Sequence, residues 1–143
     1  MKNNKYYRVY AEINLDAIVK NVDNLMALTK ENTGALAVVK ADGYGHGDVA
    51  VAKAVAQKVT GYAVATLDEA VNLRENGVKK PILVLGYVDP YEFDILVSHE
   101  ITATVFDVET AQLLADAARV QKKQAHCHIK VDTGMRRIGL EPD

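Results

Sequence analysis

The sequence predicts an α/β fold built on a parallel β-sheet, and two regularities carry this prediction. Short apolar segments that suit buried strands alternate with segments whose apolar residues recur at helical spacing. One strand and one helix together take roughly 20 to 30 residues, the length of a βα repeat on a parallel sheet. No linker, low-complexity segment or internal domain boundary is evident, so the chain is expected to form one unit.

The amino-terminal part contains the first βα repeats. An extended segment is expected over residues 7–13, and Asn14 is placed to cap the first helix. The apolar stripe of that helix comprises Leu15, Ile18, Val19, Val22, Leu25 and Met26. A buried strand is predicted over residues 36–40. Asp48 is expected to cap a second helix, whose apolar residues are Val51, Ala52, Val55, Ala56 and Val59.

The later repeats follow the same order. A strand over residues 61–65 precedes Thr66 and Glu69, whose spacing is that of a capping box, and Gly77 ends this third helix. After a strand over residues 81–85, Asp89 and Pro90 open a fourth helix. A strand over 101–106 precedes a fifth helix capped by Asp107, with apolar residues Ala111, Leu114, Ala115 and Ala118, and residues 125–133 return to extended structure.

The two faces of this last extended segment differ. Alternation places His126, His128, Lys130 and Asp132 on one face and Cys127, Ile129 and Val131 on the other. We expect the apolar face to pack under helices, with Cys127 buried there as a small residue. His126 and His128 have a spacing that zinc could use, but no second ligand cluster appears, so no metal site is predicted.

Composition excludes several classes of function. With 17 basic and 19 acidic residues and no basic cluster, the chain lacks the electrostatic footprint of a nucleic-acid-binding protein. No long apolar run suggests a membrane span, and the basic start leads into Tyr6, Tyr7 and Arg8 rather than into the apolar core of a secretory signal. A single cysteine agrees with a reducing compartment, so a cytoplasmic location is expected.

Residues 37–47, AVVKADGYGHG, carry the most chemical information. A buried-strand pattern ends on Lys40, and a glycine-rich turn follows at once. Deep apolar surroundings disfavour the ammonium form, and this supplies the neutral amine that Schiff-base formation with a carbonyl cofactor or substrate requires. The glycines allow backbone amides to approach an anion closely. The pattern predicts a reactive lysine beside an anion site.

This window resembles the pyridoxal-phosphate attachment signature of the alanine racemases, which are fold type III pyridoxal-phosphate enzymes. It matches at Val38, Lys40, Ala41, Asp42, Gly43, Tyr44, Gly45, His46 and Gly47. Similar stretches continue to the last residues: EINLDA at 12–17, TLDEA at 66–70, PILVLG at 81–86 and KVDTGMRRIG at 130–139. The resemblance therefore covers nearly the whole chain.

Periodicity alone leaves two arrangements open, a doubly wound sheet and a (β/α)₈ barrel. The resemblance implies the barrel, because alanine racemases have an N-terminal (β/α)₈ barrel followed by a mostly β domain. A complete barrel takes about 250 residues, whereas this chain shows about five βα units. We therefore expect a partial (β/α)₈ TIM-type barrel, in which residues 1–143 are the N-terminal fragment of a pyridoxal-phosphate-binding barrel domain and the rest of the barrel and the C-terminal β domain are absent. Leu36, Val38, Lys40 and Lys130 would then point inward, with both lysines in one cavity.

The resemblance also implies roles for individual residues. Lys40 is the catalytic lysine that binds pyridoxal 5'-phosphate covalently, and Tyr44 donates its hydroxyl to the cofactor phosphate. Arg137 approaches the cofactor phenolate and the substrate carboxylate, which suits a permanently charged fork of donors. Lys130 matches a lysine that is carbamylated in some racemases, and it could instead pair with an acid such as Asp132.

The function implied is interconversion of L-alanine and D-alanine for bacterial cell-wall synthesis by a cytoplasmic homodimer. In the family a second acid–base group, a tyrosine, comes from the second domain of the partner subunit, so the 143 residues alone are expected to be inactive. Unpaired sheet edges and an uncovered inner face predict that they self-associate. The alternatives are another barrel-type pyridoxal-phosphate enzyme, such as a serine racemase or an amino-acid decarboxylase, and a non-catalytic pyridoxal-phosphate carrier.

Overall fold

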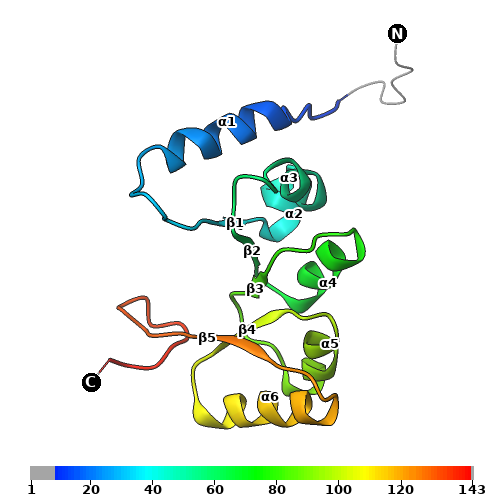
Figure 1. The fold of residues 1–143 in the computed structure, drawn as a ribbon, viewed down its shortest axis with the longest axis vertical. Coiled ribbons are helices and arrows are strands. Elements are labelled where there is room, and N and C mark those ends of the chain that lie inside the picture. Colours follow the sequence, from blue (N-terminus) through cyan, green and yellow to red (C-terminus); the bar gives the residue numbers. More distant parts are fainter. Residues whose placement is uncertain (1–8, 143) are drawn as a thin grey trace.

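The computed structural model describes residues 9–142, and Figure 1 shows their arrangement. The basic start and the first part of the extended segment expected over 7–13 lie outside the described residues, and residues 9–13 belong to no helix or strand. The elements are α1 (Leu15–Met26), β1 (Leu36–Val38), α2 (Lys40–Gly45), α3 (Asp48–Ala54), β2 (Gly61–Val64), α4 (Leu67–Glu75), β3 (Ile82–Val84), a 3₁₀ turn η1 (Pro90–Glu92), α5 (Phe93–Ser98), β4 (Thr102–Val105), α6 (Val108–Val120) and β5 (His126–Ile129).

The five strands form one parallel sheet in the order β1-β2-β3-β4-β5, so each strand pairs with its neighbour in sequence. The strand order never reverses, whereas a doubly wound sheet has a reversal at its switch point. Helices α3, α4 and α5 lie on one side of the strands, and the loop after β5 lies on the other (Figure 1). The sequence prediction of a partial (β/α)₈ barrel is confirmed, with five parallel strands and their helices.

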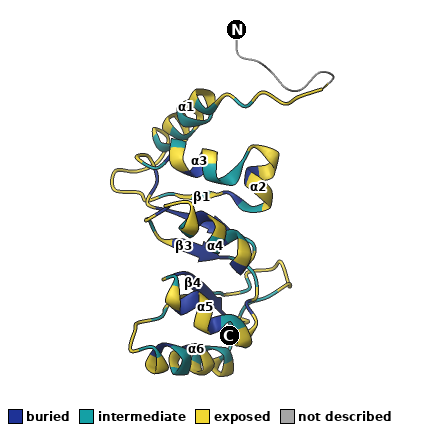
Figure 2. Cartoon of the chain, turned by 90° about the vertical axis from the view of Figure 1, so that its right-hand side faces the viewer, coloured by how far each residue is buried: buried dark blue, intermediate teal, exposed yellow. Residues whose placement is uncertain are grey.

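The core lies between the sheet and this helical layer. Every residue of the central strands β2, β3 and β4 is buried, as the dark segments of Figure 2 show. The largest of these buried side chains from strands and helices are Tyr62, Ile82, Val84, Leu73, Phe93, Leu96 and Leu114. Each such aliphatic or aromatic side chain stabilises the fold by about 1.5–3 kcal/mol relative to an exposed one.

The opposite face of the sheet is the inner face of the barrel, and it is open at the edge strands β1 and β5, whereas the residues of β2, β3 and β4 are buried. Leu36 and Val38 are 41% and 43% exposed, whereas Val39, which faces the helices, is 2% exposed. The inward direction predicted for Leu36 and Val38 agrees with this alternation. Lys40 follows at the end of β1 and is half-buried. The deep burial expected for it was wrong, because no described element covers this part of the inner face.

The edge strand β5 differs from the prediction. In register, Cys127 pairs with Ala103 and Ile129 with Val105, and these β4 residues are buried on the helical side. Every residue of β5 is nevertheless exposed, Ile129 to 69%, and Cys127 is an exposed free cysteine. The burial predicted for Cys127 was therefore wrong, because among the described residues β5 pairs with β4 alone and neither of its faces is covered.

Most predicted helix starts are confirmed. Asn14 accepts from the Ala17 amide at 2.9 Å, and Asp107 accepts from the Thr110 amide at 2.6 Å. Thr66 and Glu69 form the complete capping box of α4. Asp48 is an exception, because it is the first residue of α3 and its carboxylate bonds the next amide, that of Val49, instead of capping the helix from outside.

Arg74, near the end of α4, connects several loops at the amino-terminal ends of the strands. Its guanidinium donates to the carbonyls of Val78 and Lys80, which precede β3, both at 2.8 Å. It also donates to the carbonyls of His99 and Glu100, which precede β4, at 2.9 and 3.0 Å. One side chain thus satisfies four backbone acceptors at the end of the sheet opposite Lys40.

None of the helices described for residues 9–142 combines the length and apolar character needed to cross a lipid bilayer.

Candidate functional site

Directly after Lys40 the backbone makes a left-handed turn, which the sequence did not predict. Ala41, Asp42, Gly43 and Tyr44 have φ of 52°, 53°, 61° and 57° in succession. Left-handed helical geometry costs about 1–2 kcal/mol per residue for residues with a Cβ atom. Glycine at position 43 avoids that cost, and its neighbours must be held in place by the surrounding structure.

Hydrogen bonds hold this turn at both ends. The Ala41 amide donates to Glu69 Oε1 at 2.7 Å, and the Gly43 amide donates to the Val39 carbonyl at 2.9 Å. At the far end, His46 Nδ1 lies 3.0 Å from the Gly43 carbonyl and 3.1 Å from that of Tyr44. His46 thus orders the turn by hydrogen bonding.

Lys40 lines a cavity of about 280 Å³ at the carboxyl ends of the strands. The other lining residues are Ala65, Leu85, Gly86, Tyr87, Arg137 and Ile138. They follow β2 and β3 or belong to the loop after β5, and the carboxyl ends of barrel strands are where such folds place their active sites. Gly86 approaches the backbone closely, since a Cβ atom there would lie 2.5 Å from the Ala65 carbonyl oxygen.

Tyr87 forms part of the cavity wall and tilts against Phe106, with ring centroids 6.4 Å apart. Loss of hydration, and then the nearby carboxylates of Asp89 and Asp107, raise the pKa of the Tyr87 phenol. The hydroxyl therefore remains protonated over the neutral pH range.

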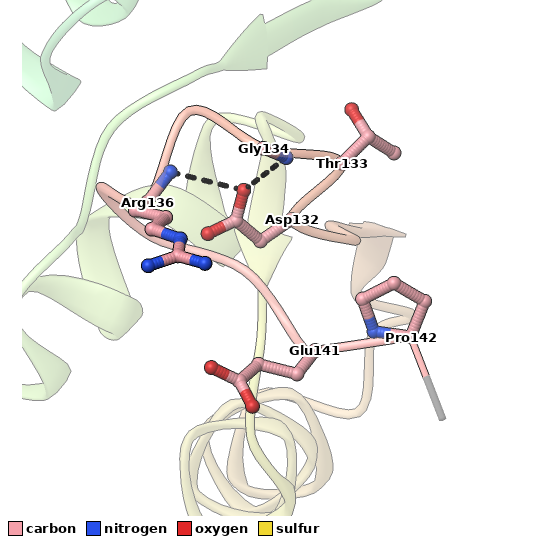
Figure 3. A pocket seen from close by; sticks show the side chains of 6 residues that line it. All are labelled: Asp132, Thr133, Gly134, Arg136, Glu141 and Pro142. Carbon is pink, nitrogen blue, oxygen red and sulfur yellow. Dashed lines mark hydrogen bonds between the residues drawn. The ribbon is translucent and has the colours of Figure 1, made fainter.

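Asp132 organises the loop that carries Arg137. Its Oδ1 accepts from the amides of Gly134 at 2.8 Å and Arg136 at 3.0 Å (Figure 3). These backbone donors hold the pKa of Asp132 below its usual value. The loop returns toward β5, because the Asp132 amide donates to the Leu140 carbonyl at 2.7 Å. Arg136 lines a separate cavity of about 480 Å³ with Asp132, Thr133, Gly134, Glu141 and Pro142, so the two neighbouring arginines face different spaces.

Comparison with known proteins decides the family. Residues 13–143 match the family model described as "Alanine racemase, N-terminal domain". The chain belongs to the alanine racemase family. It is 44% identical over 141 residues to alanine racemase 1 of Oceanobacillus iheyensis, covering 98% of this chain and 38% of that protein. It is 45% identical to alanine racemase 1 of Bacillus subtilis, covering 100% of this chain and 37% of that protein.

Solved structures give the same family. An alanine racemase of Clostridium difficile superposes with a TM-score of 0.89 at 42% identity, over 92% of this chain and 35% of the other. The alanine racemase of Bacillus anthracis with bound L-Ala-P superposes with a TM-score of 0.86 at 36% identity, over 97% of this chain and 36% of the other. The chain thus spans a little over a third of the length of these racemases.

Of the residues that the racemase resemblance singles out, the structure brings two together. Lys40 and Arg137 line one cavity, whereas Tyr44 is 60% exposed and does not line it. Lys130 is half-buried at the end of β5 and also lies outside the lining, so the two lysines do not share this cavity as expected. The reason is topological, since β1 and β5 are the opposite edges of the sheet. Within residues 9–142 no ion pair joins Lys130 to Asp132, although the nearby ammonium contributes to lowering the Asp132 pKa.

Sequence reasoning missed several site residues. Glu69 was recognised only as part of a capping box, and the lining residues Ala65, Leu85, Gly86 and Tyr87 were not singled out. A signal for the lining residues was available, because all four lie at or just after the ends of predicted strands, and parallel strands end at one edge. No local pattern indicates that the Glu69 side chain reaches the backbone of a turn in the preceding βα unit.

The residues present fit a pyridoxal phosphate cofactor. Such a group needs an amine at the edge of a cavity and a cationic donor for its oxygens. Lys40 and Arg137 supply these two features around one space. Within the described residues no group of three or more His, Cys, Asp or Glu side chains is arranged to hold a metal ion.

Proposed function

We propose that this chain is the N-terminal part of an enzyme that interconverts L-alanine and D-alanine with pyridoxal 5'-phosphate. The observation that carries the proposal is the cavity lined by both Lys40 and Arg137, two residues that are far apart in the sequence. Family membership supports the same activity, because the relatives named above are alanine racemases.

In this proposal each residue has a defined task. Lys40 would hold the cofactor through its amine and, once the substrate amino group has displaced that amine, would move a proton at the substrate α-carbon. The bound cofactor supplies an electron sink for the carbanion that loss of this proton creates. Arg137 binds the substrate carboxylate and the cofactor phenolate oxygen. Tyr44, on the left-handed turn, binds the phosphate, and Lys130 carries a carbamate that orients Arg137.

Turning an amino acid into its mirror image requires a second acid–base group on the other side of the α-carbon. The racemase relatives are more than twice as long as this chain. We infer that the second group comes from the partner subunit of a homodimer and that residues 1–143 are the first part of a barrel domain. The whole protein is placed in the cytoplasm, where D-alanine would serve cell-wall synthesis.

A polypeptide of these 143 residues alone is then inactive and self-associates. Within residues 9–142 both sheet edges are unpaired, and the inner face exposes Leu36 and Val38 at one of them. Sedimentation at increasing concentration measures this, and a well-folded monomer at high concentration contradicts it.

Trapping of the cofactor tests the assignment of Lys40. The intact protein that carries this sequence is loaded with pyridoxal phosphate, reduced with borohydride and digested, and the labelled peptide is identified by mass spectrometry. We expect the label on Lys40, no label at this position in Lys40→Ala, and an unchanged result in Lys53→Ala, which removes an exposed lysine of α3. Label on another lysine, or racemisation of alanine by Lys40→Ala, contradicts the proposal.

A different amino-acid substrate is the second candidate. A histidine racemase of Leuconostoc mesenteroides superposes with a TM-score of 0.82 at 30% identity, so a related barrel can serve a larger side chain. Three further alternatives are racemisation of serine, decarboxylation of an amino acid, and binding of the cofactor without catalysis. Measuring racemisation and decarboxylation across a panel of amino acids separates them, and we expect alanine to be preferred.

A further inference from the structure

The carboxylate of Glu69 bonds two separate backbone segments. Its Oε1 accepts from the Ala41 amide at 2.7 Å, and its Oε2 accepts from the amides of Ala65 at 2.7 Å and Thr66 at 3.3 Å. Ala41 follows Lys40 directly, and Ala65 lines the Lys40 cavity. One side chain of α4 therefore joins the backbone beside the lysine to the end of the neighbouring strand β2, which also lines the cavity.

With this contact, hydrogen bonds hold the backbone on both sides of Lys40. On the preceding side, the Val39 amide donates to the Ala63 carbonyl of β2 at 2.9 Å. On the following side, the Ala41 amide is held by Glu69. Both anchors belong to the β2–α4 unit, so the backbone on each side of Lys40 is fixed to the same neighbouring structure.

The hydrogen bond from Ala41 to Glu69 lies at a strained part of the backbone. Ala41 is the first residue of the left-handed turn, with φ of 52° and a Cβ atom that disfavours this geometry. A charged acceptor makes a stronger hydrogen bond than a neutral one. Glu69 thus holds the turn at the residue where the backbone leaves β1 and the direction of the Lys40 side chain is set.

A second side chain of α4 supports the same segment. Asn72 lies one turn after Glu69, and its Nδ2 donates to Asp48 Oδ2 at 2.9 Å, where α3 begins. The face of α4 that carries Glu69 and Asn72 therefore contacts both ends of the segment between β1 and α3.

We propose that Glu69 is a positioning residue for Lys40: its carboxylate fixes the Ala41 amide and so orients the lysine amine toward the cavity. This inference rests on the proposed role of Lys40 in binding the cofactor. It assigns to Glu69 a task beyond capping α4. The cap is formed by the Thr66 hydroxyl and by the other carboxylate oxygen of Glu69, Oε2.

Glu69→Gln isolates the effect of the carboxylate. A glutamine has one accepting oxygen and one donating nitrogen, so it cannot accept on both sides. Because the Ala65 side offers two amides and the Ala41 side offers one, we expect the oxygen to stay with Ala65 and the Ala41 bond to be lost. Thr66→Ala is the matched control, since it removes the capping hydroxyl that accepts from the Glu69 amide at 3.4 Å and keeps the Glu69 carboxylate that accepts from the Ala41 amide.

Two measurements on the intact protein test the inference. Hydrogen exchange of the Ala41 amide in cofactor-free protein is expected to be about tenfold faster in Glu69→Gln and unchanged in Thr66→Ala. The rate at which pyridoxal phosphate becomes trappable on Lys40 by borohydride is expected to fall at least about fivefold in Glu69→Gln. Thr66→Ala is expected to retain the wild-type trapping rate even though α4 loses its hydroxyl cap.

The outcomes separate the two proposals. If the wild-type protein traps cofactor on Lys40 and Glu69→Gln traps it at the same rate, the positioning role is wrong and the role of Lys40 stands. Unchanged exchange of the Ala41 amide in Glu69→Gln also overturns the positioning role. If Thr66→Ala slows trapping as much as Glu69→Gln does, the effect belongs to α4 as a helix and the inference is overturned. If the wild-type protein traps no cofactor on Lys40, the proposed function fails first.

Discussion

Lys40 and Arg137 line one cavity, although one residue comes shortly after the first strand and the other lies in the loop that follows the fifth. The adjacent Arg136 has φ of 53° and lines a different space with Glu141. The backbone conformation of this loop therefore directs the side chains of Arg136 and Arg137 into different cavities.

Replacing each arginine in turn tests this distinction. Arg137→Ala is expected to raise the KM for alanine by about 10- to 100-fold, because a charge-assisted contact to the substrate carboxylate is lost. Arg136→Ala is expected to change the KM less than threefold. Steady-state kinetics of the intact protein measures both, and equal effects of the two substitutions contradict the assignment.

The loop of Arg137 should respond to pH through Asp132. Backbone amides lower the pKa of Asp132 below its ordinary value of 3.8. The stabilisation from ionised Asp132 is therefore fully present above pH 3.8 and is lost as the pH falls through the lower folded-state pKa. We expect the NMR shift of the Arg136 amide to stay constant down to about pH 4 and to change only below it. A transition above pH 4, or one that persists in Asp132→Asn, contradicts this prediction.

A buried hydroxyl in β2 provides a test of core stability. Tyr62 is 1% exposed, its hydroxyl donates to the Ala52 carbonyl at 2.6 Å, and burial raises its pKa. Tyr62→Phe is expected to lower the free energy of unfolding by about 1–3 kcal/mol, because the Ala52 carbonyl loses its side-chain donor in a buried place. Tyr91→Phe is the control, since Tyr91 is 95% exposed and surface changes stay within about 0.5 kcal/mol. Denaturant unfolding compares the two.

The start of α6 offers a second stability test. Asp107 accepts from the Thr110 amide at 2.6 Å and from its hydroxyl at 2.9 Å. Asp107→Ala is expected to cost about 1–2 kcal/mol through loss of this cap. Asp116→Ala, which removes the exposed ion pair with Arg119 in the same helix, is expected to cost less than about 0.5 kcal/mol. The same unfolding measurement applies, and equal costs contradict the capping argument.

Local patterns in the sequence were sufficient for most of the fold. Helix starts at Asn14, Thr66 and Asp107 were predictable because a cap and the next amides lie within three residues. The left-handed turn after Lys40 was not predictable, because tertiary hydrogen bonds such as that from Ala41 to Glu69 stabilise it against the preference of the residues themselves.

The candidate site shows the same division. Lys40 and Arg137 could be predicted from the motifs around them, whereas Glu69 could not, since its contact crosses from one βα unit to the next. The exposure of Cys127 was missed for a related reason. Alternation gives the direction of a side chain along a strand, but only the neighbouring elements decide whether that face is covered.

The four backbone carbonyls that accept hydrogen bonds from Arg74 lie at the amino-terminal ends of β3 and β4, away from the Lys40 cavity. In barrels of this kind, that end contributes to stability and the other end to chemistry. A laboratory selection for heat resistance could therefore draw its substitutions from around Arg74 while turnover is left intact. A selection for a new substrate would draw on the opposite rim, so the two properties of this scaffold can evolve separately.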